Sequence, residues 1–228
     1  KPFLEDWRKE FIGEAIAVVF PINIEEIKSL LIFAKANNLS LIPQGGNTGL
    51  CGGATPNKNF NNILISFKSF NKIRSIDIIS NTIIVESGCV LESIQNEVDK
   101  FSKVFPIDLS SKGSCTIGGN IGTNAGGNNV IRYGSTRDVV LGIEAILPNG
   151  NIINNLSNPL KDNTEYPFHK LLVGSEGTLG IITAAKIKLF EKPKSKITIC
   201  IEIKNIEMAM ETMFNLKYNL GNDIEAFE

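Results

Sequence analysis

Glycine is concentrated in two short stretches of this chain. Residues 43–53 read PQGGNTGLCGG and residues 113–127 read GSCTIGGNIGTNAGG, and together they hold eleven of the twenty glycines. Glycine within ordered structure costs roughly 0.5–1 kcal/mol relative to alanine, so this density indicates close approach of the backbone to something. Leu50, Ile117 and Ile121 lie inside these stretches, and neither contains Lys or Glu, which argues against flexible surface loops. Because consecutive free N–H groups form anion sites, we predict a cradle for a phosphate-bearing cofactor.

The composition is that of a soluble globular protein of one large domain, or of one domain and part of another. The 228 residues are 43% hydrophobic and 21% charged, with a net charge of −1. The chain has no basic run, which argues against a nucleic-acid partner. It has no apolar run of the roughly 18–20 residues that a membrane span requires. The four cysteines have no metal-ligand or disulfide spacing, so we expect reduced thiols and a cytoplasmic protein that is at most peripheral to a membrane.

Hydrophobic periodicity predicts an α+β fold. Asn23 is expected to cap a helix that ends at residues 37–38, with Glu25 and Glu26 in its first turn. A second helix is expected over 91–101. The predicted strands before the second glycine stretch are 15–20, 39–42, 62–66, 73–79 and 82–86.

The second half of the chain is predicted to be strand-rich. The expected strands are 139–147, 151–154, 171–173, 184–190 and 197–203, and a helix is expected over 207–216. Pro193, between Lys192 and Lys194, indicates a domain boundary. Because the last strand and helix cannot bury their own apolar faces, we expect the chain to be cut within a second domain. It begins with Lys1, so we also expect the native N-terminus, with any targeting segment, to be missing.

Three common site motifs are absent. Neither glycine stretch ends in the Gly-Lys-Ser/Thr of a phosphate-binding P-loop, and neither is a dinucleotide fingerprint followed by an acid. Ser175 lacks the Gly-x-Ser-x-Gly frame of a nucleophile elbow. A serine triad would depend on His169, the one histidine of the chain.

Several motifs, in order, carry a family resemblance. They are PQGGNTGL at 43–50, DLSSKGSCTIGGNIGTNAGG at 108–127, RYGS at 132–135, PNG at 148–150, LKDNTEY at 160–166 and LLVGSEGTLGIIT at 171–183. Together they resemble the FAD-linked D-lactate, glycolate and D-2-hydroxyglutarate dehydrogenases, whose flavin domain is of the vanillyl-alcohol-oxidase/PCMH type. PQGGNTGL, RYGS and LKDNTEY are most similar to the D-2-hydroxyglutarate branch.

The resemblance implies a domain plan and a reaction. Residues 1–192 would form a PCMH-type FAD-binding domain with subdomains of about 1–90 and 91–192, and residues 193–228 would begin a substrate (cap) domain. The whole enzyme would oxidise a D-2-hydroxy acid to the 2-oxo acid by hydride transfer to flavin N5, and a separate acceptor would reoxidise the flavin. The base and the metal-binding histidines would belong to the missing C-terminal part, so we expect no catalytic residue and no metal ligand in this chain.

The resemblance also implies which residues bind FAD. Pro43, Gly45, Gly46, Asn47, Thr48 and Gly49 match the diphosphate loop. Gly113, Ser114, Ile117, Gly118 and Gly119 match the segment along the ribityl and adenosine parts. Asn124, Gly126 and Gly134 match the stretch that closes around the flavin, and Gly177, Gly180 and Ile182 match the strand entry beside it.

Four single residues need separate interpretation. Asn47 stands where some members of the family attach flavin through histidine, so we expect non-covalent FAD. Cys115 is expected to be a small buried residue, and His169 a structural or surface residue. Glu176 could tune the flavin or cap a neighbouring backbone, and we expect the cap.

Two other functions are open at this point. One is a non-catalytic FAD-binding subunit for electron transfer, which a downstream domain rich in His and Glu would argue against. The other is a flavin reductase of cell-wall precursor synthesis, which is disfavoured because its motifs would not match GSEGTLGIIT so closely.

Overall fold

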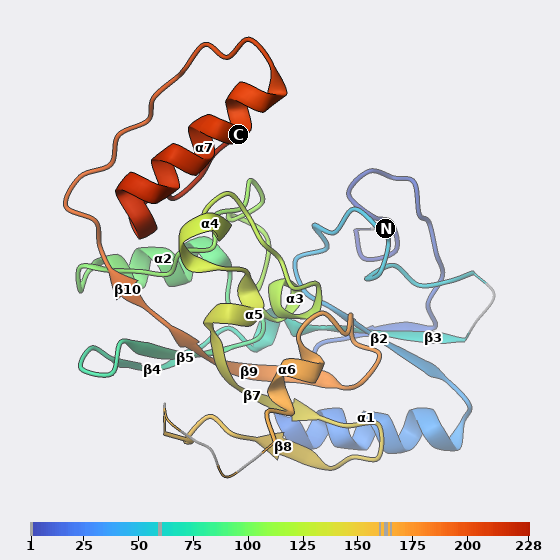
Figure 1. Ribbon diagram of the computed structural model, residues 1–228. Helices are drawn as coiled ribbons and strands as arrows, with labels where there is room; N and C mark the ends of the chain where they lie inside the picture. Colours follow the sequence, from blue (N-terminus) through green and yellow to red (C-terminus); the bar gives the residue numbers. More distant parts are fainter. Residues whose placement is uncertain (1, 59–60, 160, 162–163, 165) are drawn as a thin grey trace.

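The chain folds around two sheets of unlike topology. A computed structural model describes residues 2–58, 61–159, 161, 164 and 166–228 (Figure 1). The first sheet is parallel and has the strand order β1-β3-β2, and the helix α1 lies in the crossover that connects its two outer strands, β1 and β2. Its elements are β1 (Ala17–Val19), α1 (Ile24–Ala36), β2 (Ser40–Gln44) and β3 (Asn62–Ser66).

The start of α1 follows from its sequence. The Asn23 side chain accepts a hydrogen bond from the Glu26 N–H at 2.9 Å, as the predicted cap requires. Glu26 in turn accepts one from the Ile22 N–H at 2.9 Å. The first bond satisfies a donor that the first turn of a helix leaves free, and the second fixes the residue that precedes the cap.

The second sheet is antiparallel and has the order β4-β5-β9-β7-β8. Its core face packs against two helices through fully buried Ile83, Ile143, Ile94 and Ile121. The elements are β4 (Ile73–Asp77), β5 (Thr82–Glu86), α2 (Leu91–Asp99), α3 (Ile117–Gly122), β7 (Val140–Ile146), β8 (Ile152–Asn154) and β9 (Ile181–Lys188).

The sheets divide the chain between β3 and β4, where the short helix η1 (Phe67–Ser69) lies. The subdomain boundary expected near residue 90 does not coincide with this division. Strand β5 ends before residue 90 and already belongs to the second sheet, where its Glu86 pairs with Ala184 of β9. A second buried cluster joins the two sheets, since Ile27 of α1 and Ile65 of β3 pack with Ile146 of β7 and Ile181 of β9.

Two predicted strands are wrong. Residues 171–173 are expected to be a strand, but α6 (His169–Leu172) occupies most of that range, because a short apolar run does not distinguish a buried helix from a strand. Apolar and polar side chains alternate over residues 197–203, as they would in a strand, yet these residues form no strand. Ile197 and Ile199 are 81% and 72% exposed, so no neighbouring edge receives them.

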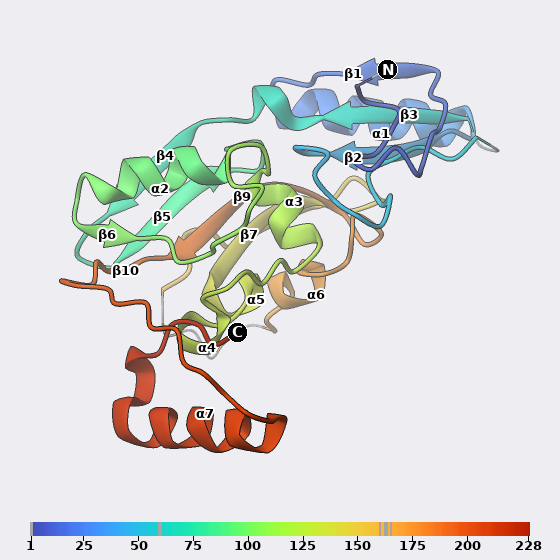
Figure 2. The same ribbon diagram turned by 90° about the horizontal axis from the view of Figure 1, so that it is seen from above.

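The predicted C-terminal helix is present and lies away from both sheets. It is α7 (Ile206–Leu220), and it buries no residue (Figure 2). The remaining elements are short: β6 (Lys103–Val104) pairs with β10 (Phe190–Glu191), and α4 (Val130–Tyr133), α5 (Thr136–Val139) and η2 (Gly221–Asp223) are single turns. Of the helices in the described part of the chain, none has both the length and the apolar character that crossing a membrane takes.

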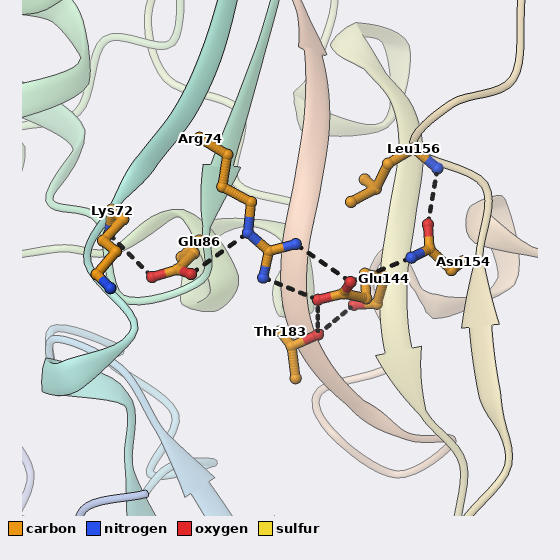
Figure 3. A network of polar contacts seen from close by, with 7 residues as sticks. All are labelled: Lys72, Arg74, Glu86, Glu144, Asn154, Leu156 and Thr183. Carbon is orange, nitrogen blue, oxygen red and sulfur yellow. Dashed lines mark hydrogen bonds and ion pairs between the residues drawn. The ribbon is translucent and has the colours of Figure 1, made fainter. Parts of the chain in front are cut away.

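A polar network joins all five strands of the larger sheet (Figure 3). The Arg74 guanidinium donates to both carboxylate oxygens of Glu144, at 3.0 and 3.1 Å, and to Glu86 at 3.3 Å. Thr183 and Asn154 donate to the same Glu144 carboxylate, at 2.8 and 3.1 Å. Burial alone would lower the pKa of Arg74, but the hydrogen bonds and charges of Glu144 and Glu86 outweigh it, and the pKa is raised. The network therefore fixes the register of neighbouring strands, because the Arg74 and Glu144 charges would each be destabilising without the other.

Arg74→Met is expected to destabilise the fold by about 3 kcal/mol, because it leaves the Glu144 carboxylate buried without its cation. Urea unfolding followed by circular dichroism measures this loss. Lys28→Met, which breaks the exposed pair with Glu25, is the control and should cost less than about 0.5 kcal/mol. Equal effects of the two substitutions would contradict the importance of the network.

Candidate cofactor site

The two glycine stretches and the segment after α6 meet around one cavity of about 430 Å³. The cavity lies where β2 ends and where α3 begins, so residues more than 70 positions apart in the sequence face one another. Eleven of the predicted FAD-binding residues line it: Pro43, Gly45, Gly46, Asn47, Thr48, Gly49, Gly118, Gly119, Gly177, Gly180 and Ile182.

A second cavity, of about 670 Å³, adjoins the first. Both are lined by the segment 44–47 and by Thr116, so this loop forms a ridge between them. The second cavity also contains Lys68, Gly88 and the predicted residue Ser114. The ridge with a hollow on either side suits an elongated ligand that has a central anionic group.

Five of the predicted residues line neither cavity: Gly113, Ile117, Asn124, Gly126 and Gly134. Ile117 is fully buried in the main core. Asn124 accepts a hydrogen bond from the Arg137 N–H at 2.9 Å, and Gly134, at φ +79°, packs against Asp138. Contact of these five with a cofactor stays a prediction.

The glycines of the site serve two different purposes. A Cβ on Gly46 would lie 2.0 Å from the Ser114 carbonyl oxygen, and one on Gly45 would lie 2.2 Å from the Thr116 Oγ1. These glycines therefore let the two glycine stretches pack against each other. In contrast, a Cβ on Gly49 would meet nothing within 4 Å, so this position is open on the cavity side.

Several donors at the cavity have no protein acceptor. Among the described residues, no backbone N–H from Gly46 to Gly49 donates to a carbonyl outside the strand ladders or to a side chain. The hydroxyls of Ser87 and Thr116 are buried, line the cavity and have no partner. Since buried polar groups are normally hydrogen-bonded, these groups fit a ligand rich in acceptors, as a diphosphate is.

Side-chain amides hold the loop in place. The buried Gln44 donates to the Ala54 and Phe3 carbonyls, at 2.8 and 3.0 Å. Asn47 adopts a left-handed φ of +54° and donates to the Glu5 carbonyl at 2.7 Å. The Asn47 side chain is thus engaged with the N-terminal segment, whereas its backbone faces the cavity.

Most of the polar side chains that line the cavities are not among the predicted residues, and Gln44, Ser87 and Thr116 are examples. Gln44 and Thr116 lie inside the glycine stretches and could have been found as their polar members. Ser87 carries no sequence signal, because it follows β5, which is distant in sequence from both stretches. Glu176 lines the cavity, and no backbone N–H of the described chain donates to its carboxylate, so the expected backbone cap is not observed.

All four cysteines are free. Cys115 is buried, and burial raises the pKa of the Cys89 thiol to about 11. Within the described ranges no cluster of three or more His, Cys, Asp or Glu residues could hold a metal ion.

His169 lines neither cavity. It begins α6, is half-buried, and its Nδ1 lies 3.1 Å from the Asn155 amide nitrogen. Burial first, and the charge of Lys170 second, lower its pKa below the usual 6.5.

Comparison with known proteins identifies the class. The FAD binding domain model matches residues 15–155, and the chain belongs to that family. It is 40% identical over 225 residues to a mitochondrial D-2-hydroxyglutarate dehydrogenase of Arabidopsis thaliana, and 35% identical over 226 residues to a D-2-hydroxyglutarate–pyruvate transhydrogenase of Saccharomyces cerevisiae. These alignments cover 98% and 99% of this chain but 40% and 45% of the relatives.

Solved structures agree with this assignment. Alkyldihydroxyacetonephosphate synthase superposes with a TM-score of 0.69 at 26% identity, over 78% of this chain and 32% of that one. The α+β fold of the PCMH type is thereby confirmed. The chain spans about 40% of the length of the dehydrogenases it resembles.

The single histidine permits a direct titration test. Its proton NMR signal should titrate with a midpoint below 6.5 in the folded chain and return to about 6.5 in denaturant. Because the folded state favours neutral His169, its contribution to stability is complete above pH 6.5 and is lost as the pH falls below that value. A folded midpoint at or above 6.5 would contradict a folded state that favours the neutral ring.

Proposed function

We propose that this chain is the cofactor-binding part of an FAD-dependent dehydrogenase that oxidises a D-2-hydroxy acid, D-2-hydroxyglutarate or D-lactate, to the 2-oxo acid. The observation that carries the proposal is the cavity itself, with its unpartnered N–H groups and its buried hydroxyls. The printed names of the relatives support the substrate class. Bound FAD would supply the two-electron acceptor for this oxidation.

The ridge between the cavities is the proposed diphosphate position. The N–H groups of residues 46–49 would donate to the phosphate oxygens, as successive backbone donors do in other anion sites. Of the residues that the structure describes, Lys68 is the one charged residue lining the larger cavity, and Glu176 is the one charged residue lining the smaller. The halves of FAD on either side of the diphosphate would enter the two cavities, with Thr116 in contact with both.

Non-covalent attachment is part of the proposal. Asn47 cannot form a histidyl link, and its amide is committed to the Glu5 carbonyl. His169 is engaged with Asn155, away from the cavity. No other histidine exists in the chain.

Substrate binding is proposed to need the rest of the protein. No Lys, Arg or His of the described residues lines the smaller cavity, so nothing there would hold a substrate carboxylate. We propose that residues 1–192 form the FAD-binding domain and that 193–228 begin the substrate domain, in agreement with the exposed apolar residues of α7. The base, and a divalent metal where one is used, would come from that second domain, and the electron acceptor is a separate partner.

The free cysteines support a reducing compartment such as the cytoplasm, whereas the name of the plant relative includes a mitochondrial location.

FAD uptake is the first test. The purified chain, mixed with FAD, should show the absorbance bands of bound oxidised flavin and quench its fluorescence. Acid precipitation should then release the yellow cofactor into the supernatant. Flavin that stays with the denatured polypeptide would contradict non-covalent binding.

Gly49→Val is the matched variant. It places a branched side chain in open space at the cavity, so the fold should keep its stability while FAD affinity falls at least tenfold. Gly46→Val is unsuited to this purpose, because its Cβ would strike the Ser114 carbonyl oxygen of the chain itself. Undiminished FAD binding by Gly49→Val would place the cofactor elsewhere.

The reaction is tested with the whole protein. In its complete length and loaded with FAD, it should reduce an artificial dye with D-2-hydroxyglutarate or D-lactate and not with the L-enantiomers. The 228-residue chain alone should give no detectable turnover, because a placed base contributes about 10²–10⁴-fold and substrate positioning contributes more. Dye reduction by the chain alone would show that its own residues suffice for catalysis.

A further inference from the structure

Glu176 occupies an unusual backbone conformation at the cavity. Its φ is +49°, between Gly174 at +82° and Gly177 at +79°. The left-handed region is unfavourable for a residue with a side chain, and such residues persist where the surroundings enforce them. The conformation is therefore imposed by the fold around this turn.

The turn is braced from two sides. The N–H groups of Gly174 and Glu176 donate to the carbonyls of Ile121 and Gly122, both at 2.9 Å, at the end of α3. A Cβ on Gly177 would lie 2.8 Å from Pro43, so the turn also packs against the first glycine loop. These contacts hold the Glu176 side chain at the cavity. Its Oε2 lies 2.9 Å from the position that a Cβ would take if Gly53 carried one.

The carboxylate has no protein partner. Among the described residues it makes no hydrogen bond and no ion pair, and no basic side chain lines this cavity. The Arg137 guanidinium lies next to Gly174 but donates to the Val173 carbonyl at 2.7 Å. Glu176 thus contributes an uncompensated negative charge to the cavity.

We propose that Glu176 lowers the reduction potential of the bound FAD. The inference rests on the proposed flavin site. Reduction adds two electrons and either two protons, which gives a neutral reduced flavin, or one proton, which gives an anion. A carboxylate beside the flavin disfavours the anion, so it weakens binding of the reduced form relative to the oxidised form. Glu176 is exposed to water, which screens its charge and limits the effect to about tenfold.

The test compares the wild-type chain with Glu176→Gln, which keeps the size of the side chain and removes its charge. Both are saturated with FAD, and the midpoint potential is measured at pH 8 against a reference dye. Glu176→Gln should favour the reduced form about tenfold, which for this two-electron couple is a midpoint about 30 mV more positive. Glu211→Gln, which removes an exposed charge on α7, is the control and should leave the potential unchanged.

The outcomes separate this inference from the proposed function. If the wild-type chain takes up no FAD, the proposed function fails and the inference fails with it. If both chains bind FAD with the same potential, the flavin site stands and the role of Glu176 is overturned. Weaker FAD binding by Glu176→Gln at an unchanged potential also overturns this role, because Glu176 would then contribute equally to the binding of oxidised and of reduced FAD.

Discussion

The close approach of two glycine stretches is the constraint on which the site depends. Gly45 and Gly46 lie against Thr116 and the Ser114 carbonyl at distances that leave no room for a Cβ. This contact joins the end of the small parallel sheet to the segment that leads into α3, and so it sets the position of the ridge between the two cavities. The glycines are needed first for this packing within the chain. The open positions left beside it, such as Gly49, are the ones that a ligand can use.

The polar network of the larger sheet adjoins two residues of the cavity wall. Glu86 and Thr183 belong to the network, and their chain neighbours Ser87 and Ile182 line the cavity. The Ser87 N–H donates to the Thr183 carbonyl at 2.9 Å, which ties the two lining positions together. Because a slip of one residue would turn every side chain of a strand to the other face, the charged pairs that fix register also fix which residues face the ligand.

The sequence predicts the parts of this structure that local signals encode. The Asn23 cap, α1 and the strands 62–66 and 82–86 follow from capping chemistry and periodicity. The strand expected over 197–203 does not form, because alternation creates a strand only where another edge pairs with it. The glycine motifs locate the ligand loop, but Ser87 reaches the cavity only through the pairing of β5 with β9, which no local pattern contains.

The charges that line the two cavities suit a phosphate-bearing ligand better than a small free anion. The first glycine loop offers N–H dipoles in place of cations, and Lys68 is the one cation among the described residues that line either cavity. Backbone dipoles are fixed by the fold and need no counter-charge, so they can hold an anionic group without the desolvation of a buried charge. An anionic ligand in the smaller cavity would meet a wall whose one full charge, among the described residues, is the Glu176 carboxylate, and like charges repel. The arrangement therefore favours an uncharged ring system over a free anion in the smaller cavity.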